Sequence, residues 1–250
     1  MKAWQWIIFL VFAYLVFLVV HLPASYVAET VQKQSKGDIQ MAGVSGTLFK
    51  GQALALDANG FIVNNINWNL SPLSLFLLKA NIDLQGGVLR SQEQPYVKAN
   101  AVLSLLSPEH FTLRNAEILL PAKSVLSQFP LPVAVTANGR FRVDIQHLEM
   151  APQCTELVGT GAWLNALVDT PQQPVDLGNF EANLKCEDGN LIVSIVEPNS
   201  LQLSADILVD TQGNYEVNGQ FKPSQDLPEV IQQASAFFPE GENGFYRIEL

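Results

Sequence analysis

Charged side chains are scarce in this 250-residue chain, and basic ones are the scarcest. Asp, Glu, Lys and Arg together make up 15% of the residues, and 14 Lys and Arg stand against 24 Asp and Glu, for a net charge of −10. Because phosphates are bound by clustered Lys and Arg, this balance argues against nucleic acid as a partner and against docking on anionic lipid through basic patches. Hydrophobic residues reach 48%, which excludes disorder and leaves ample material for a core.

The sequence also lacks the common catalytic motifs. It contains no G-x-S-x-G elbow, no H-E-x-x-H, no P-loop and no G-x-G-x-x-G. We interpret His110 and His147 as surface or packing residues, although His147 lies close to an acidic residue in a strand pattern. Glu240 and Glu242 lack the spacing of a calcium loop and are interpreted as a solvated turn. We therefore expect no catalytic residue, no metal site and no cofactor.

Cysteine is nearly absent, since only Cys154 and Cys186 occur. In an oxidising compartment two cysteines of one domain readily form a disulfide, which would stabilise the fold by about 3–4 kcal/mol in the chain-entropy model. The alternatives are two buried free thiols or a pair of metal ligands. A metal would want further soft ligands, and the chain has only three histidines. We predict the disulfide.

One long apolar run is present, at residues 3–20 (AWQWIIFLVFAYLVFLVV), and no charged side chain interrupts it. With His21 and Leu22 it reaches the roughly 20 residues that span a hydrocarbon core. Trp4, Trp6 and Tyr14 supply aromatic side chains of the kind found at headgroup level. A lysine before the run favours a cytoplasmic amino terminus. We predict a single transmembrane anchor over residues 1–23, with the remaining chain in the periplasm of a Gram-negative cell.

Two other interpretations of the run are weaker. A cleaved signal peptide has an apolar region of about 7–15 residues and small residues at −3 and −1 of the cut. Cuts after residues 24, 25 and 28 would place Leu22, Pro23 or Tyr26 at −3. A buried core helix would be apolar on one face only, whereas this run is apolar all round.

The periodicity changes after the anchor. Residues 24–37 have helical spacing and are predicted to extend the membrane helix as a juxtamembrane segment, and residues 38–250 alternate with period two between turn signals. No βαβ rhythm occurs, so we predict a mainly β, antiparallel, meander-like domain, either a sandwich or a curved open sheet. Short helices are predicted at 121–129 and 228–238, while 72–78 fits a helical turn or a strand. Ala-Asn-Gly at 58 and 137 suggests two similar halves with a boundary near 121–137.

Trp68 and Trp163 both lie in strand patterns. Strand tryptophans are most simply core residues. The functional alternative places them on the wall of an apolar groove or on a partner surface.

The chain resembles the protein N family of the bacterial type II secretion system. The resemblance is carried by the anchor, by SGTLFKG at 45–51, by WNLSPLSL at 68–75, by the two cysteines with Asp188-Gly189 after the second, and by GFYRI at 244–248. It covers nearly the whole chain in order and spacing. Two positions depart from the family pattern: Phe49 stands where tryptophan is expected, and Lys79 where glycine usually follows Leu-Leu.

The resemblance implies a non-catalytic, single-pass inner-membrane subunit that supports export of folded proteins across the outer membrane. Its partners would be other inner-membrane secretion subunits, reached in one version through an edge strand. The sheet is also similar to the AsmA-like group of anchored β proteins, some of which carry lipid in an apolar groove. Lipid binding or transfer is therefore the second hypothesis, and an enzyme is the third and least favoured.

Overall fold

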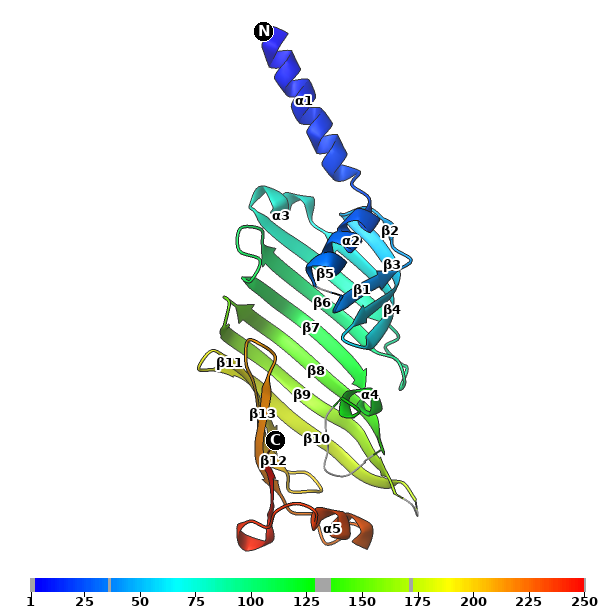
Figure 1. Cartoon of the computed structure of the whole chain (residues 1–250), viewed down its shortest axis with the longest axis vertical. Helices are drawn as coiled ribbons and strands as arrows, with labels where there is room; N and C mark the ends of the chain where they lie inside the picture. Colours follow the sequence, from blue (N-terminus) through cyan, green and yellow to red (C-terminus); the bar gives the residue numbers. More distant parts are fainter. Residues whose placement is uncertain (1–2, 36, 129–135, 171–172, 250) are drawn as a thin grey trace.

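The computed structural model describes residues 3–35, 37–128, 136–170 and 173–249. Five α-helices, one 3-10 helix and fourteen strands occur in these ranges (Figure 1). The helices are α1 (Ala3–Val20), α2 (Ala24–Gln34), α3 (Pro72–Phe76), α4 (Ala122–Leu126), α5 (Glu229–Ser235) and η1 (Glu242–Gly244). The strands are β1 (Ile39–Ala42), β2 (Ser45–Gly46), β3 (Lys50–Ala58), β4 (Phe61–Leu70), β5 (Lys79–Gly87), β6 (Tyr96–Ser104), β7 (Phe111–Pro121), β8 (Thr136–Met150), β9 (Cys154–Asp169), β10 (Val175–Glu187), β11 (Asn190–Val196), β12 (Ser204–Val209), β13 (Tyr215–Phe221) and β14 (Tyr246–Glu249).

All fourteen strands form one antiparallel sheet. From β3 onward each strand pairs with the next in the chain, β1 lies outside β3, and β2 pairs with β3 off the main path. This confirms the prediction of a mainly β, antiparallel meander, and it decides between the two shapes in favour of a curved open sheet. The strands alternate apolar and polar residues and are joined mostly by short connections, so each strand folds back beside its predecessor.

Turn chemistry sets two of the hairpins. Asn59 and Gly60 join β3 to β4 with φ of 51° and 85°, and Asp188 and Gly189 join β10 to β11 with φ of 51° and 81°. Two successive residues with positive φ make the turn whose twist matches that of paired strands, and Asn-Gly and Asp-Gly adopt it at the least cost. The second Ala-Asn-Gly differs, because Gly139 lies inside β8 at an irregularity in its pairing with β9. The repeated tripeptide therefore does not mark equivalent positions.

The amino-terminal region departs from its prediction. Residues 24–37 do not extend the first helix: α1 ends at Val20, and α2 begins after Pro23, which is in extended conformation. The Leu22 carbonyl accepts a hydrogen bond from the Leu48 amide, which turns the chain away from the axis of α1. In the described residues, no helix combines the length and the apolar content needed to cross a membrane.

The short helices are more numerous than predicted. The segments 121–129 and 228–238 contain α4 and α5, with residue 129 outside the described residues. Segment 72–78, which fits either structure by sequence, forms α3 with Pro72 in its first turn, where the missing N–H has no helical partner. α2 and η1 complete the set.

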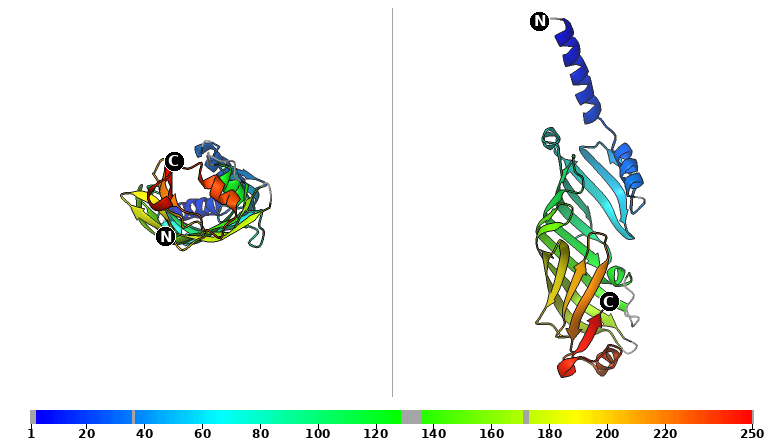
Figure 2. Two further views of the ribbon diagram at one scale, coloured as in Figure 1. Left: turned by 90° about the horizontal axis from the view of Figure 1, so that it is seen from below. Right: turned by 60° about the vertical axis from the view of Figure 1, so that its left-hand side comes forward.

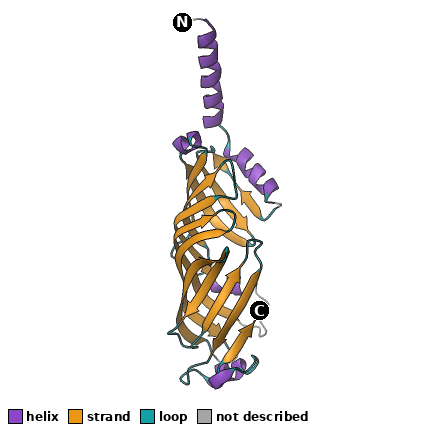
Figure 3. Cartoon of the chain, turned by 90° about the vertical axis from the view of Figure 1, so that its left-hand side faces the viewer, coloured by secondary structure: helices purple, strands orange, loops and turns teal. Residues whose placement is uncertain are grey.

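The sheet is curled about its long direction into an open trough, seen along its axis in Figure 2 and from the side in Figure 3. We call the face that carries the buried apolar side chains the inner face. Three clusters of buried side chains lie along it: one on β3 and β4, one on β7 to β10, and one on β9 and β10 beneath α5. The opposite, outer face carries the polar partners of the central strands.

Candidate functional site

The inner face is apolar from the first strands to the last. Cross-strand partners follow one another in a row that contains only apolar residues and glycine: Gly86, Val97, Ile118, Val143, Gly161, Ala182, Ile195, Ala205, Gly219 and Ile248. Most of these side chains are half-buried, because none of the described elements forms a second layer over the middle of the sheet. The result is a continuous apolar floor that remains accessible.

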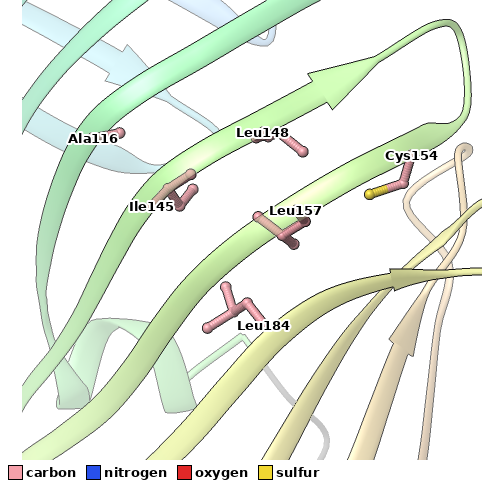
Figure 4. Close-up of a cluster of buried hydrophobic side chains, with 6 residues drawn as sticks. All are labelled: Ala116, Ile145, Leu148, Cys154, Leu157 and Leu184. Carbon is pink, nitrogen blue, oxygen red and sulfur yellow. The ribbon is translucent and has the colours of Figure 1, made fainter.

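The best-packed part of this floor lies at the centre of the sheet. Figure 4 shows its six buried residues on β7 to β10, of which Ile145, Leu157 and Leu184 lie on three neighbouring strands. Gly159 lies between Ile145 and Leu184 in the pairing, and a Cβ there would be 2.9 Å from the Asp144 carbonyl oxygen. The glycine therefore lets two large side chains share one level of the curved sheet.

An aromatic ladder crosses the inner face near one end. The ring of Trp163 is stacked between Phe141 and Phe180, with centroids 5.4 and 5.5 Å away. Its indole N–H donates to the Asn138 carbonyl at 3.1 Å. Trp68 is also half-buried on the inner face, beside Ile66, and its N–H donates to the Leu48 carbonyl at 3.2 Å. Both tryptophans thus combine core packing with a position on the floor.

Helix α5 lies at the end of the trough far from α1 (Figures 1 and 2). Its apolar residues Val230 and Ile231 pack against the buried cluster of Val175, Leu177 and Phe180. Ser235 is buried, and its hydroxyl donates a hydrogen bond to the Ile231 carbonyl one turn earlier, so this polar side chain is satisfied within the helix.

The two cysteines form a disulfide, as predicted. Cys154 and Cys186 have Cα atoms 5.5 Å apart and lie at the start of β9 and the end of β10. The last regular pair of these strands on this side is Leu184 with Gly159, so the covalent link lies beyond the hydrogen-bonded ladder. Cys154 is buried in the central cluster, and its amide donates to the Gly189 carbonyl. The bond fastens the β9–β10 pair where backbone pairing has ended.

The outer face carries a row of polar cross-strand partners, among them Lys98, Glu117, Asp144, Thr160, Asn183 and Ser194. Arg142 contacts Glu117 at 3.2 Å and Asp144 at 2.7 Å. The hydrogen bond that Arg142 donates to Asp144 raises the pKa of the guanidinium above its usual value, and the charges of both carboxylates add to that. These side chains are partly exposed, so the network keeps this face soluble and contributes little to stability.

Arg140 differs from Arg142 because it is buried, with 7% of its surface exposed. Its Nη1 donates to the Leu89 carbonyl at 2.7 Å, while Nε and Nη2 have no hydrogen-bond partner among the described residues. Desolvation lowers the pKa of the guanidinium, and Glu117 opposes that shift through its charge. A buried cation with two unmatched donor groups costs stability.

One group of potential metal ligands comes together in the described part of the chain. His147, Glu149 and Glu156 each place a ligand atom within 4.8 Å of the others, and His147 Nε2 lies 3.7 Å from a Glu156 oxygen. Glu149 and Glu156 are exposed cross-strand partners. The contact between His147 and the exposed Glu156 is therefore a weak electrostatic interaction. His110 and the carboxylates at 240 and 242 are outside this group.

The aromatic residues assigned to the anchor lie on α1, and Trp4, Trp6 and Tyr14 are 72%, 56% and 62% exposed. No element of the sheet covers them, since α1 projects away from the body (Figures 1 and 3). Trp6 makes an edge-to-face contact with Phe9 within the helix.

A family model places this chain among known proteins. The model of type II secretion system protein N matches residues 37–249, which is nearly the whole chain after α2. The chain belongs to the type II secretion system protein N family. Relatives named type II secretion system protein N include one from Aeromonas hydrophila, 28% identical over 93% of this chain and 92% of the relative.

A second protein N, from Vibrio cholerae, is 26% identical over 89% of this chain and 87% of its own length. A third, from Pectobacterium carotovorum, is 24% identical over 91% and 87%. No solved structure matches the chain. Family membership assigns this chain to the type II secretion system as a component of that machinery.

The sequence suggested an apolar groove as an alternative, but not which residues form its continuous floor. Period-two alternation separates inner from outer residues only between irregularities, and those at Asn138/Arg140 and Ile145/His147 shift the alternation within β8. Without knowing where these shifts occur, the apolar sets of successive strands cannot be aligned into one row.

Proposed function

We propose that this protein is a non-catalytic subunit anchored in the inner membrane by α1, with its sheet in the periplasm beside other inner-membrane secretion subunits. Membership of the protein N family across residues 37–249 is the observation that carries the proposal. The disulfide agrees with an oxidising compartment. The three parts are residues 1–23 as cytoplasmic tip and anchor, 24–37 as juxtamembrane segment and 38–250 as periplasmic domain.

The proposed anchor extends beyond the last residue of α1, Val20. The 18 helical residues would extend over about 27 Å, slightly less than the hydrocarbon thickness of roughly 30 Å. Helix-type hydrogen bonds continue past Val20, from the His21 amide to the Phe17 carbonyl and from the Leu22 amide to the Val19 carbonyl. Residues 3–22 together reach the required length, and the apolar side chains described on α1 are exposed.

The orientation and retention of α1 are tested in intact cells. A reporter that is active only in the periplasm, fused after Leu250, should be active, and the protein should stay in the membrane fraction after alkaline carbonate washing. Sequencing of the mature amino terminus should find the chain intact. The anchor would be removed from the proposal if the mature chain began after Pro23. It would also be removed if the periplasmic reporter were inactive while a reporter that works only in the cytoplasm, fused at the same position, were active.

A second function, the binding of a lipid acyl chain, is favoured by the accessible apolar floor. The cross-strand row from Gly86 to Ile248 offers no polar side chain, and the backbone of its strands is already hydrogen-bonded in the sheet. A bound polypeptide would leave its own N–H and C=O groups unpaired there, whereas a hydrocarbon chain has none to satisfy. The chemistry of the floor therefore fits an acyl chain better than a peptide.

Two neighbouring residues of β10 provide a matched test of lipid binding. Ala182 lies on the inner face between Gly161 and Ile195, and Asn183 lies on the outer face. Phospholipid that copurifies in mild detergent is measured by mass spectrometry for the wild type, Ala182→Glu and Asn183→Glu. We expect loss of lipid only for Ala182→Glu. Equal lipid in all three proteins, or none in the wild type, would leave the subunit role as the only function.

A further inference from the structure

The end of the sheet nearest α1 carries a concentration of exposed apolar side chains. Leu73, Phe76, Leu77 and Leu78 follow β4, and Leu105 and Leu106 follow β6. Phe76 is 76% exposed and Leu106 is 75% exposed. The Leu105 amide donates to the Leu78 carbonyl at 2.9 Å, so the two loops form one surface. We call residues 72–78 and 105–106 the apolar tip.

Backbone hydrogen bonds place this tip beside the base of α1. The Leu22 carbonyl, just after α1, accepts a hydrogen bond from the Leu48 amide. The residue after Leu48 is Phe49, and its carbonyl accepts a hydrogen bond from the Leu70 amide. Leu70 is the last residue of β4, and α3 begins two residues later. Figure 1 shows α3 and the lower end of α1 at the same end of the molecule. The tip therefore faces whatever environment α1 enters.

The composition of the tip fits a bilayer surface. Residues 71–78 and 105–108 include no charged side chain, and Lys79 and Glu109 border them. Apolar side chains that enter the acyl boundary need no charge complementarity, and an exposed lysine next to them can reach the headgroups. Leu78 has φ of 55°, a left-handed conformation that a leucine adopts at a steric cost, and it presents its side chain half-exposed.

We propose that the apolar tip inserts into the interfacial region of the bilayer that α1 crosses. This inference rests on the proposed anchor, because the nearness of α1 is the reason to choose a membrane as the occupant. Two attachments at one end hold the trough upright on the membrane. They also bring the end of the inner face that is opposite to α5 against the lipid surface.

Three exposed phenylalanines allow a matched test with the full chain. Phe9 lies on α1, Phe76 in the tip and Phe237 just after α5 at the far end, with 60%, 76% and 72% exposure. Each is changed to cysteine separately, labelled with an environment-sensitive fluorophore without reducing the native disulfide, and reconstituted in vesicles of phosphatidylethanolamine and phosphatidylglycerol. Quenching by nitroxide-bearing lipid is then measured. Leu106→Cys provides a second probe from the other loop of the tip.

We expect quenching at Phe9→Cys, Phe76→Cys and Leu106→Cys, and none at Phe237→Cys. Quenching at Phe9→Cys alone would overturn the tip inference and leave the anchor in place. Quenching at the tip without quenching at Phe9→Cys would support the tip and remove the anchor. Equal quenching at Phe76→Cys and Phe237→Cys would show that a fluorophore at any exposed position contacts the lipid, and would overturn the inference.

Discussion

Removing the disulfide should lower the stability of the sheet by a predictable amount. The bond closes a loop with a sequence separation of 32 residues. In the chain-entropy model, closing a loop of this length removes about 3.7 kcal/mol of conformational freedom from the unfolded chain at 25 °C. The double change of Cys154 and Cys186 to alanine keeps the inner face apolar and leaves only a small change in packing. Its main effect should therefore be on the unfolded state.

Urea unfolding in mild detergent, followed by tryptophan fluorescence, measures this loss. With a denaturant slope of about 3 kcal/mol/M, the midpoint should fall by about 1.2 M in the double variant. Reduction of the wild-type protein should produce a similar shift, because it opens the same loop. If the reduced and oxidised wild type unfold at the same midpoint, the reasoning from loop closure is refuted. A shift only in the alanine variant would assign the effect to packing of Cys154.

Three further predictions concern single positions. Arg140→Met should be neutral or stabilise the fold by about 1–3 kcal/mol in urea unfolding, because it removes a buried cation with two donors that have no partner among the described residues; a clear loss of stability would show that the cation is needed. Gly86→Val should destabilise by about 1–3 kcal/mol, since its new side chain meets Ile66, and a midpoint like the wild type would contradict this contact. The hydrogen bond that the Asn214 side chain donates to Asp210 lowers the pKa of this carboxyl, and hydrogen bonds from turn amides lower it further. Protection of these amides from hydrogen exchange should therefore persist at neutral pH and fall once acid protonates the carboxylate. Unchanged protection in acid would contradict this prediction.

Local sequence determined the class of the fold. Alternation in β6, β10 and β12, with Asp188-Gly189 as a turn signal, is sufficient to predict antiparallel neighbours, because strand period and turn conformation depend only on nearby residues. The disulfide was also predictable, since Cys154 had one possible partner. The apolar composition of residues 3–20 is likewise a property of the sequence alone.

The tertiary structure decided how these elements combine. Whether the meander closes into a sandwich or stays an open trough depends on the twist and on strand irregularities such as that at Gly139, which arise from contacts between strands. Pro23 breaks the helix between α1 and α2, since it has no N–H to continue it, but the path of the chain there is fixed by the hydrogen bond from the Leu48 amide to the Leu22 carbonyl, 26 residues apart. The apolar floor and the tip beside α1 exist only after distant segments are brought together. No local pattern specifies such long-range pairings, because each depends on the register and curvature of the whole sheet.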